Sequence, residues 1–233
     1  MTSLVIFDFD GTLFDTHASI CRCIKLTFDA LLPDHAPKEE EVQRYISSGA
    51  GLSDTFKALN PSKNEFNADT EAQWTAKYRE LYAEHGQPLI RAFPGARELL
   101  QHIRSANIPI AIVSNKGVAA VLTALEKNDL IDFIPKDLIV GDKTEGATRK
   151  PDTASYGKVL LPILQSNYGI SIIDSSKVLE VGDTVADIQF ARNIGGKSCW
   201  CRFGYGDRRQ CEELKPDYTV DSLTEVIPLV SKN

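Results

Sequence analysis

Two acidic residues close to the N-terminus are the first candidates for chemistry in this chain. Asp8 and Asp10 lie two positions apart, and Asp10 comes directly before Gly11. Side chains two positions apart on an extended backbone point to the same face. The preceding residues 4–7 are all apolar, which is typical of a strand buried on both faces of a parallel sheet. The pattern therefore predicts two carboxylates at the carboxyl edge of such a sheet, where open α/β folds place their active sites.

Further polar residues follow two later apolar runs. Ser114 and Asn115 come after residues 109–113, and Asp183 and Asp187 come after residues 177–181. Because the carboxyl ends of parallel strands meet at one edge of a sheet, we expect these groups to converge in one crevice with the first two acids. A cation can join them from a loop, because the proline after Lys150 restricts that lysine to an extended backbone.

Several acids at one edge need a counter-charge, and a divalent cation is the expected solution. Oxygen ligands with room for water suit Mg²⁺ better than a softer metal. A hydroxyl, the backbone amides after Gly11 and Ser114, a lysine and Mg²⁺ can together bind a phosphoryl dianion. One carboxylate can then attack as a nucleophile and form an aspartyl-phosphate, while the second exchanges protons with the leaving oxygen and with water.

Each motif alone also has an ordinary structural explanation. An aspartate pair at a strand end can be a turn or cap, and Ser114 with Asn115 can cap a helix. Lys150 alone reads as a solvated surface lysine, and Asp183 sits in a plain strand-to-helix turn. The active-site interpretation rests on the motifs occurring together and in order.

The elements that position these groups fall into two blocks. Apolar residues recur at helical spacing over 20–32, 38–46 and 69–85, and no strand-like run occurs between about residues 16 and 86. We therefore expect an all-helical insertion at residues 16–87, with hinges at 15–16 and 86–88.

Strands and helices alternate after the insertion, which predicts an α/β fold with a doubly wound parallel sheet. Residues 1–15 and 88–233 are expected to form this core domain. Its later strands are expected at 109–113, 138–140, 177–181, 198–201 and 218–220. One helix is expected to begin at residue 94 and extend beyond 103, and a second follows residue 117 and ends at 125. Further helices are expected at 152–165 with a kink or break at Pro162, at 185–194, and at 223–230 with a break at Pro228 as one option.

Composition limits the class of protein further. A chain of 233 residues can hold one large domain, or one domain with an insertion, and a net charge of −6 gives no reason to expect nucleic acid binding. No apolar run approaches the roughly 18 residues needed to span a membrane, and the N-terminus lacks a secretory pattern. We expect a cytoplasmic protein. The five cysteines fit reduced thiols, and neither Cys21/Cys23 nor Cys199/Cys201 has the spacing of a zinc site.

The ordered motifs resemble those of the haloacid dehalogenase superfamily of phosphohydrolases, in its phosphoglycolate-phosphatase-like branch. The segments that carry the resemblance are residues 8–13, 114–116, 149–151 and 182–187. The resemblance covers essentially the whole chain, and in that family a helical cap is inserted between the first and second motifs. It implies that residues 16–87 are such a cap.

The resemblance also implies roles for individual residues. Asp8 would be the nucleophile and Asp10 the general acid and base. Mg²⁺ would be held by Asp8, the backbone carbonyl of Asp10 and Asp183, with Asp187 in support as a ligand or a neighbour of the ligands. The phosphate-binding and supporting residues would be Gly11, Thr12, Ser114, Asn115 and Lys150.

The expected function is that of a Mg²⁺-dependent phosphatase acting on a small phosphorylated metabolite. Dehalogenating relatives lack the second acid of the first motif, so Asp10 disfavours dehalogenation. Phosphonate-cleaving relatives use a cap lysine, and Lys25, the nearest, looks like a solvated helix residue. Two alternatives stay open: a phosphomutase of the β-phosphoglucomutase type, and a non-catalytic phosphate-binding protein on the same fold. The physiological substrate and the oligomeric state do not follow from the sequence.

Two glycine-containing segments have two interpretations each. Residues 47–52, which include Gly49 and Leu52, are either a specificity loop facing the site or a plain turn between helices, with nothing to favour one over the other. Residues 141–147 are either a mobile loop beside the site or a surface connection, and the surface connection is favoured.

Overall fold

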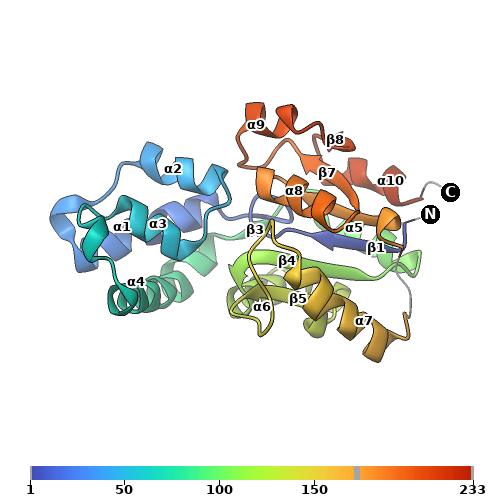
Figure 1. The fold of residues 1–233 in the computed structure, drawn as a ribbon, viewed down its shortest axis with the longest axis horizontal. Helices are drawn as coiled ribbons and strands as arrows, with labels where there is room; N and C mark the ends of the chain where they lie inside the picture. The colour runs from blue at the N-terminus through green and yellow to red at the C-terminus, as the bar shows by residue number, and fades with distance from the viewer. Residues whose placement is uncertain (1, 171–173, 232–233) are drawn as a thin grey trace.

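A six-stranded sheet forms the core of the computed structural model, which describes residues 2–170 and 174–231 (Figure 1). Its strand order is β5-β4-β1-β6-β7-β8, and every pair of neighbours runs parallel. The central strand pairs on one side through Val5 with Ile110 and on the other through Val5 with Leu179. The strands are β1 Leu4–Phe7, β4 Ile110–Gly117, β5 Ile139–Asp142, β6 Val178–Gly182, β7 Lys197–Cys201 and β8 Tyr218–Val220.

Strand β1 is apolar throughout because helices cover both faces of the sheet. Leu4 and Ile6 pack in a cluster with α7 (Leu161–Tyr168) and α8 (Val185–Asn193), through side chains such as Leu164 and Phe190. Val5 and Phe7 face the opposite cluster, which includes residues of α5 (Ala96–Ser105), α6 (Val118–Lys127) and α10 (Ile227–Ser231). The expected doubly wound α/β fold is confirmed.

The helical insertion lies to the left of the sheet in Figure 1. It contains α1 (His17–Leu31), α2 (Glu39–Ser47), α3 (Leu52–Leu59) and α4 (Ala68–Leu81). Its aromatic centre brings the rings of Phe28 and Phe56 within 4.6 and 5.3 Å of the Trp74 ring, between centroids. Residues 16–87 are all described, and every regular element in them is helical, as expected. We call this insertion the cap. Its exact limits as a domain stay a prediction.

A two-stranded ribbon joins the cap to the core. Strand β2 (Phe14–Asp15) pairs antiparallel with β3 (Arg91–Ala92), so the chain segments that lead into and out of the cap are held together. Two-residue strands are too short to show a periodic pattern, so they could not be expected from the sequence. The predicted hinges lie directly beside this ribbon.

Other differences from the expected elements are local. Helix α3 and helix α9 (Arg208–Glu213) were not expected, and β4 continues four residues past the expected end at 113. The helix expected at 152–165 begins as a π-helical segment, and α7 starts one residue before Pro162. The π-helical segments are Tyr82–Gly86 and Ser155–Leu160, and the 3₁₀ segments are Pro33–His35, Lys63–Glu65, Gln87–Leu89, Ile131–Phe133, Lys136–Leu138, Ser175–Lys177 and Leu223–Val226.

The sequence contains no apolar run long enough for a membrane-spanning helix. Within residues 2–170 and 174–231, no helix has the length and apolar character that crossing a bilayer requires.

Candidate active site

The carboxyl edge of the sheet brings three aspartates together. Asp8 follows β1, Asp183 follows β6, and Asp187 lies in the first turn of α8. Each offers a carboxylate oxygen, and these oxygens all lie within 4.8 Å of one another. The three side chains are buried. Carboxylates this close form a group that could hold a metal ion.

Lys150 is the cation of this cluster. Its Nζ lies 2.8 Å from Asp8 Oδ1, 2.5 Å from Asp187 Oδ1 and 3.6 Å from Glu180 Oε1. Only 2% of the side chain is exposed. Burial alone would lower the pKa of Lys150, but the charges of Asp187, Asp8 and Glu180 raise it above its ordinary value, so the lysine stays charged.

One lysine does not balance these acids. Burial raises the pKa of Asp8 to about 6, and the charge of Asp187 adds to this shift while Lys150 opposes it. Burial, together with Asp187 and Asp8, also raises the pKa of Asp183. Raised carboxyl pKa values show that more positive charge would stabilise the ionised cluster. A hard divalent cation with oxygen ligands fits this donor set.

The turn after β1 fixes the position of Asp183. Thr12 Oγ1 donates a hydrogen bond to Asp183 Oδ1 at 3.2 Å, and the backbone N–H of Tyr205 donates to Oδ2 at 2.7 Å. Gly11 has a φ of +76°, and a Cβ at this position would lie 2.3 Å from Asp183 Oδ2. Only glycine allows this close approach.

Asp187 is held by the start of its own helix. The backbone N–H and the hydroxyl of Thr184 both donate to Asp187 Oδ2, at 2.8 and 2.7 Å. This capping box leaves Oδ1 directed at Lys150. Asp187 therefore supports the cluster from α8 with the one oxygen that the capping box does not use.

Asp10 forms its ion pair with Lys116, whereas Asp8 forms its ion pair with Lys150. Lys116 Nζ lies 2.9 Å from Asp10 Oδ1 and 4.5 Å from the centroid of the Tyr82 ring. Ser114, two residues earlier on β4, is buried, and its Oγ accepts the backbone N–H of Lys116 at 3.3 Å. The two acids of the first motif therefore lie in different electrostatic surroundings.

Asn115 uses its side chain to join three segments. Its Oδ1 accepts the backbone N–H of Lys150 at 3.0 Å, and its Nδ2 donates to the carbonyl of Gly49 in the cap at 3.2 Å. The side chain of Asn115 therefore ties β4 to the segment of Lys150 and to the cap.

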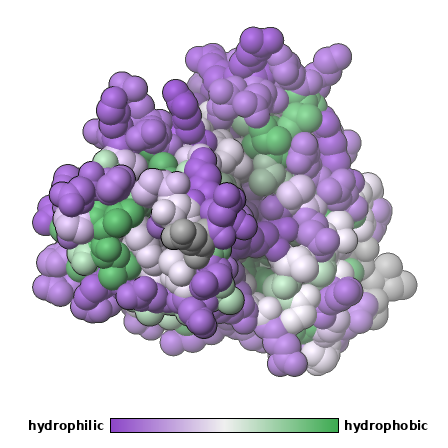
Figure 2. Space-filling view, turned by 60° about the vertical axis from the view of Figure 1, so that its left-hand side comes forward, coloured by the Kyte–Doolittle hydropathy of each residue, from purple (hydrophilic) through white to green (hydrophobic). Residues whose placement is uncertain are grey.

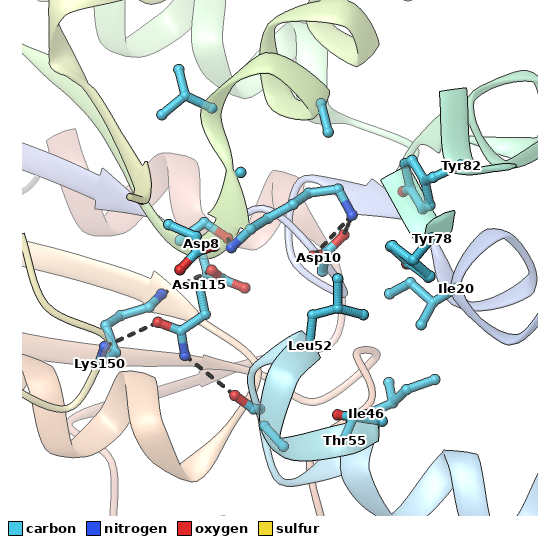
Figure 3. A pocket seen from close by; sticks show the side chains of 18 of the residues that line it. Asp8, Asp10, Ile20, Ile46, Leu52, Thr55, Tyr78, Tyr82, Asn115 and Lys150 are labelled. Carbon is cyan, nitrogen blue, oxygen red and sulfur yellow. Dashed lines mark hydrogen bonds and ion pairs between the residues drawn. The ribbon is translucent and has the colours of Figure 1, made fainter. Parts of the chain in front are cut away.

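A cavity of about 720 Å³ lies between the core and the cap (Figure 3). Asp8, Asp10, Ser114, Lys150 and Asp183 line its core side. Its size lies within the usual range for small-molecule sites. The outer surface where core and cap meet is mainly hydrophilic (Figure 2). The structure thus combines three buried acids, the buried Lys150, the partly buried Lys116 and a cavity of small-molecule size in one site.

Comparison with known proteins identifies the family. The family model described as haloacid dehalogenase-like hydrolase matches residues 5–201. The chain belongs to this family. The chain is 28% identical to a phosphoglycolate phosphatase from Vibrio parahaemolyticus, over 98% of this chain and 96% of that protein. It is 27% identical to the pyrophosphatase PpaX from Bacillus cereus, over 97% of this chain and 95% of that protein. These matches group it with the phosphatases of the haloacid dehalogenase-like hydrolases.

Solved structures agree on the fold. A haloacid dehalogenase-like family hydrolase from Streptococcus pneumoniae superposes with a TM-score of 0.78 at 23% identity. The match covers 98% of this chain and 98% of that chain. The six-stranded core and the inserted cap are therefore the fold of the haloacid dehalogenase-like hydrolases.

The sequence did not single out several residues of this site. Lys116 belongs to the segment 114–116 that carries the resemblance, but the sequence assigned it no role of its own. Glu180 lies in β6 beside Lys150, where a single charge in an apolar strand was the available signal. Tyr205 comes from the loop after β7, and its hydroxyl donates to Asp15 at 2.8 Å. That relation spans 190 positions of the chain, and no local pattern marks it.

The two glycine-containing segments both lie at the site. Asp142 and Lys143, with Thr144, line the cavity, so the favoured interpretation of residues 141–147 as a mere surface connection is wrong. Asp142 forms an ion pair with Arg79 of the cap, whose Nη2 lies 3.3 Å from Asp142 Oδ2. Residues 47–52 approach the core through the Gly49 carbonyl, and Leu52 lines the cavity. Their role in specificity stays a prediction.

The remaining candidates are not part of the site. Lys25 is exposed on α1 and pairs with Asp29 at 2.7 Å, as expected of a solvated helix residue. All five cysteines are free thiols, and the metal-capable group found among the described residues contains none of them.

Proposed function

We propose that this protein is a Mg²⁺-dependent phosphatase that hydrolyses a small phosphomonoester through an aspartyl-phosphate on Asp8. The observation that carries the proposal is the position of Asp8. Its carboxylate faces the cavity, 2.8 Å from the Lys150 ammonium and beside Asp183 and Asp187. The names of two curated relatives, a phosphoglycolate phosphatase and a pyrophosphatase, support phosphoryl chemistry.

In the first half-reaction, an oxygen of Asp8 attacks the phosphorus of the bound ester. The bond between phosphorus and the ester oxygen breaks, and Asp10 donates a proton to that oxygen so that it leaves as an alcohol. Lys150, the Ser114 hydroxyl and the backbone N–H groups of Thr12 and Asn115 would hold the phosphoryl oxygens. Asp10 can serve as the acid because it faces the same cavity without sharing Lys150.

In the second half-reaction, Asp10 takes a proton from a water molecule, which attacks the phosphorus of the aspartyl-phosphate. The bond between phosphorus and Asp8 breaks, inorganic phosphate leaves, and both aspartates return to their starting states. The cap covers the cavity and would exclude other water while the intermediate exists.

The donor set of the carboxylate cluster fits Mg²⁺. Asp8 and Asp183 would supply carboxylate oxygens, the backbone of Asp10 a carbonyl, and Asp187 would act as a ligand or steady the cluster through Lys150. When bound, the cation would neutralise charge on the transferring phosphoryl group.

Replacement of Asp8 tests this proposal. Asp8→Asn keeps the shape of the side chain and removes the nucleophile, so phosphate release from p-nitrophenyl phosphate in the presence of Mg²⁺ should fall to background. Asp29→Asn, an exposed substitution on α1, is the matched control and should retain activity. Rapid quenching of the wild-type reaction should also yield a phosphorylated peptide that contains Asp8. Retained turnover by Asp8→Asn would contradict the mechanism.

A further inference from the structure

The walls of the cavity differ sharply between its two sides. The core side carries the acids and lysines described above, whereas the side opposite the phosphate site is mostly apolar. In Figure 3, Leu52 projects from α3 into the space between Asp10 and Asn115. The apolar wall is formed chiefly by Ile20, Ile24, Ile46, Leu52, Tyr78 and Val118.

Most of this wall comes from cap helices whose other faces form the core of the cap, and Val118 adds to it from α6 of the core domain. Ile20 and Ile24 lie one helical turn apart on α1, so both point to one side of that helix. Ile46 ends α2, Leu52 begins α3 and Tyr78 belongs to α4. The apolar lining is therefore a continuation of the cap core towards Asp10, not an isolated side chain.

The cationic side chains at the cavity already have partners, with one exposed exception. Lys150 is paired with Asp8 and Asp187, and Lys116 is paired with Asp10. Arg79 lies 3.3 Å from Asp142, at the outer part of the cavity.

The exception is Lys143, which is exposed to solvent. Within the described ranges 2–170 and 174–231, no buried cation at this cavity is therefore left to meet a second anionic group of a substrate.

We infer that the leaving group of the substrate is uncharged and largely apolar. This inference rests on the proposed phosphatase function and names the substrate class of the same site. A carboxylate or second phosphate placed against the apolar wall would lose its hydration without gaining a cation, which is strongly unfavourable. Each methylene group placed there is instead removed from water, which favours binding.

The leaving group inferred here differs from those of the substrates for which two relatives are named. Phosphoglycolate carries a carboxylate on its leaving group, and pyrophosphate releases a second phosphate. Both leaving groups are anionic. We expect both compounds to be poor substrates here, and esters of simple alcohols or longer apolar alcohols to be better ones.

A pair of substrates with the same shape provides the first test. Isobutyl phosphate and 2-phosphoglycolate have leaving groups with the same number and branching of heavy atoms, but only the second carries a charge. We expect kcat/KM for isobutyl phosphate to exceed that for phosphoglycolate by at least 10-fold. In a series from ethyl to hexyl phosphate, kcat/KM should rise about 4-fold for each added methylene until the cavity is filled.

Substitutions at the apolar wall connect this preference to the structure. Asparagine is close in size to leucine but polar, so Leu52→Asn should flatten the rise of kcat/KM along the alkyl series. Leu52→Met keeps the apolar character and should preserve the rise. Leu59→Asn, at the other end of α3 and away from the cavity, is the matched control.

The outcomes separate the inference from the function on which it rests. If phosphoglycolate or pyrophosphate is hydrolysed by an Asp8-dependent reaction with a higher kcat/KM than isobutyl phosphate, the apolar leaving group is wrong and the phosphatase function stands. An unchanged alkyl series in Leu52→Asn would also overturn the inference. If the wild-type protein hydrolyses no ester, p-nitrophenyl phosphate included, both fall.

Discussion

The ammonium of Lys116 lies 2.9 Å from Asp10 Oδ1, and the ammonium of Lys150 lies 2.8 Å from Asp8 Oδ1. The two acids of the first motif are thus held by different cations from different segments. Burial alone would lower the pKa of Lys116, but the charge of Asp10 raises it above its ordinary value, so the lysine stays charged. Separate partners fit separate proposed roles, a nucleophile at Asp8 and a proton donor at Asp10.

Removal of the Lys116 ammonium should weaken catalysis without emptying the phosphate site. In Lys116→Met, Asp10 loses the group that holds its carboxylate at the cavity, and a misplaced acid can cost about 10²-fold in rate. We expect kcat to fall by about 10- to 100-fold with little change in KM, measured by phosphate release at saturating Mg²⁺. Lys116→Arg should recover part of the loss. A fall that is confined to KM would show that Lys116 binds substrate instead.

Neutralisation of Asp10 should separate proton transfer from metal binding. Asp10→Asn keeps the backbone carbonyl, which is the group proposed to meet Mg²⁺, and removes the proton donor. We expect kcat to fall by about 10² to 10⁴, because general acid–base catalysis contributes that much. Mg²⁺ affinity, measured by calorimetry, should stay close to wild type. A large loss of Mg²⁺ affinity would place the side chain, not the carbonyl, on the metal.

The stabilisation provided by Mg²⁺ should depend on pH. Without a bound cation, burial raises the pKa of Asp8 from 3.8 to about 6. The folded protein therefore binds more protons than the unfolded chain between these values, and this group's contribution to stability falls as pH rises from about 4 to about 6. Mg²⁺ requires the ionised carboxylate, so it should raise Tm more at pH 7.5 than at pH 5.

Thermal unfolding in EDTA and in Mg²⁺ at the two pH values measures this difference. Asp183→Asn removes a proposed ligand and should abolish the Mg²⁺-dependent shift at both values. An equal shift in the wild-type protein at pH 5 and pH 7.5 would argue against an ionisable cluster as the binding site.

The fold and the acidic cluster could be predicted from the sequence because the patterns that indicate them are local. The apolar run before Asp8 and the polar groups after each later strand sit within a few residues of one another, and parallel topology then brings them to one edge. Gly11 belongs to the same local signal, although its reason, the approach of Asp183, appears only in three dimensions. Sequence pattern and parallel topology were enough to predict which side chains meet, wherever those side chains follow strands of the same sheet.

Relations between distant segments could not be predicted. The pairing of Lys116 with Asp10, a residue 106 positions away, is visible only in the structure. The ribbon of β2 and β3 is too short to show a period, and residues 52–59 form a run of only eight residues, which is short for helical periodicity to be decisive. The contact of residues 141–147 with the cap runs through Arg79, which lies 3.3 Å from Asp142 and 63 positions away from it in the chain. Such contacts arise from tertiary packing, not from local propensity.

The Tyr205 hydroxyl joins the start of the cap to the core, and its removal should loosen that connection selectively. It accepts the backbone N–H groups of Thr16 and His17 at 2.6 and 3.0 Å and donates to Asp15. Tyr205→Phe leaves those N–H groups without this partner, so unfolding free energy should fall by about 1–3 kcal/mol. Faster hydrogen exchange should appear first at Thr16 and His17. Mg²⁺ affinity should persist, because the backbone N–H of residue 205 still holds Asp183.

Because α1 begins at His17 and carries the apolar wall, the same variant should also lower kcat/KM for the longer alkyl phosphates by several-fold. Tyr218→Phe, which alters a half-exposed tyrosine in β8 far from the cap, is the matched control and should change none of these quantities. Unaltered exchange at residues 16 and 17 in Tyr205→Phe would show that the Tyr205 hydroxyl is not needed to hold the start of the cap.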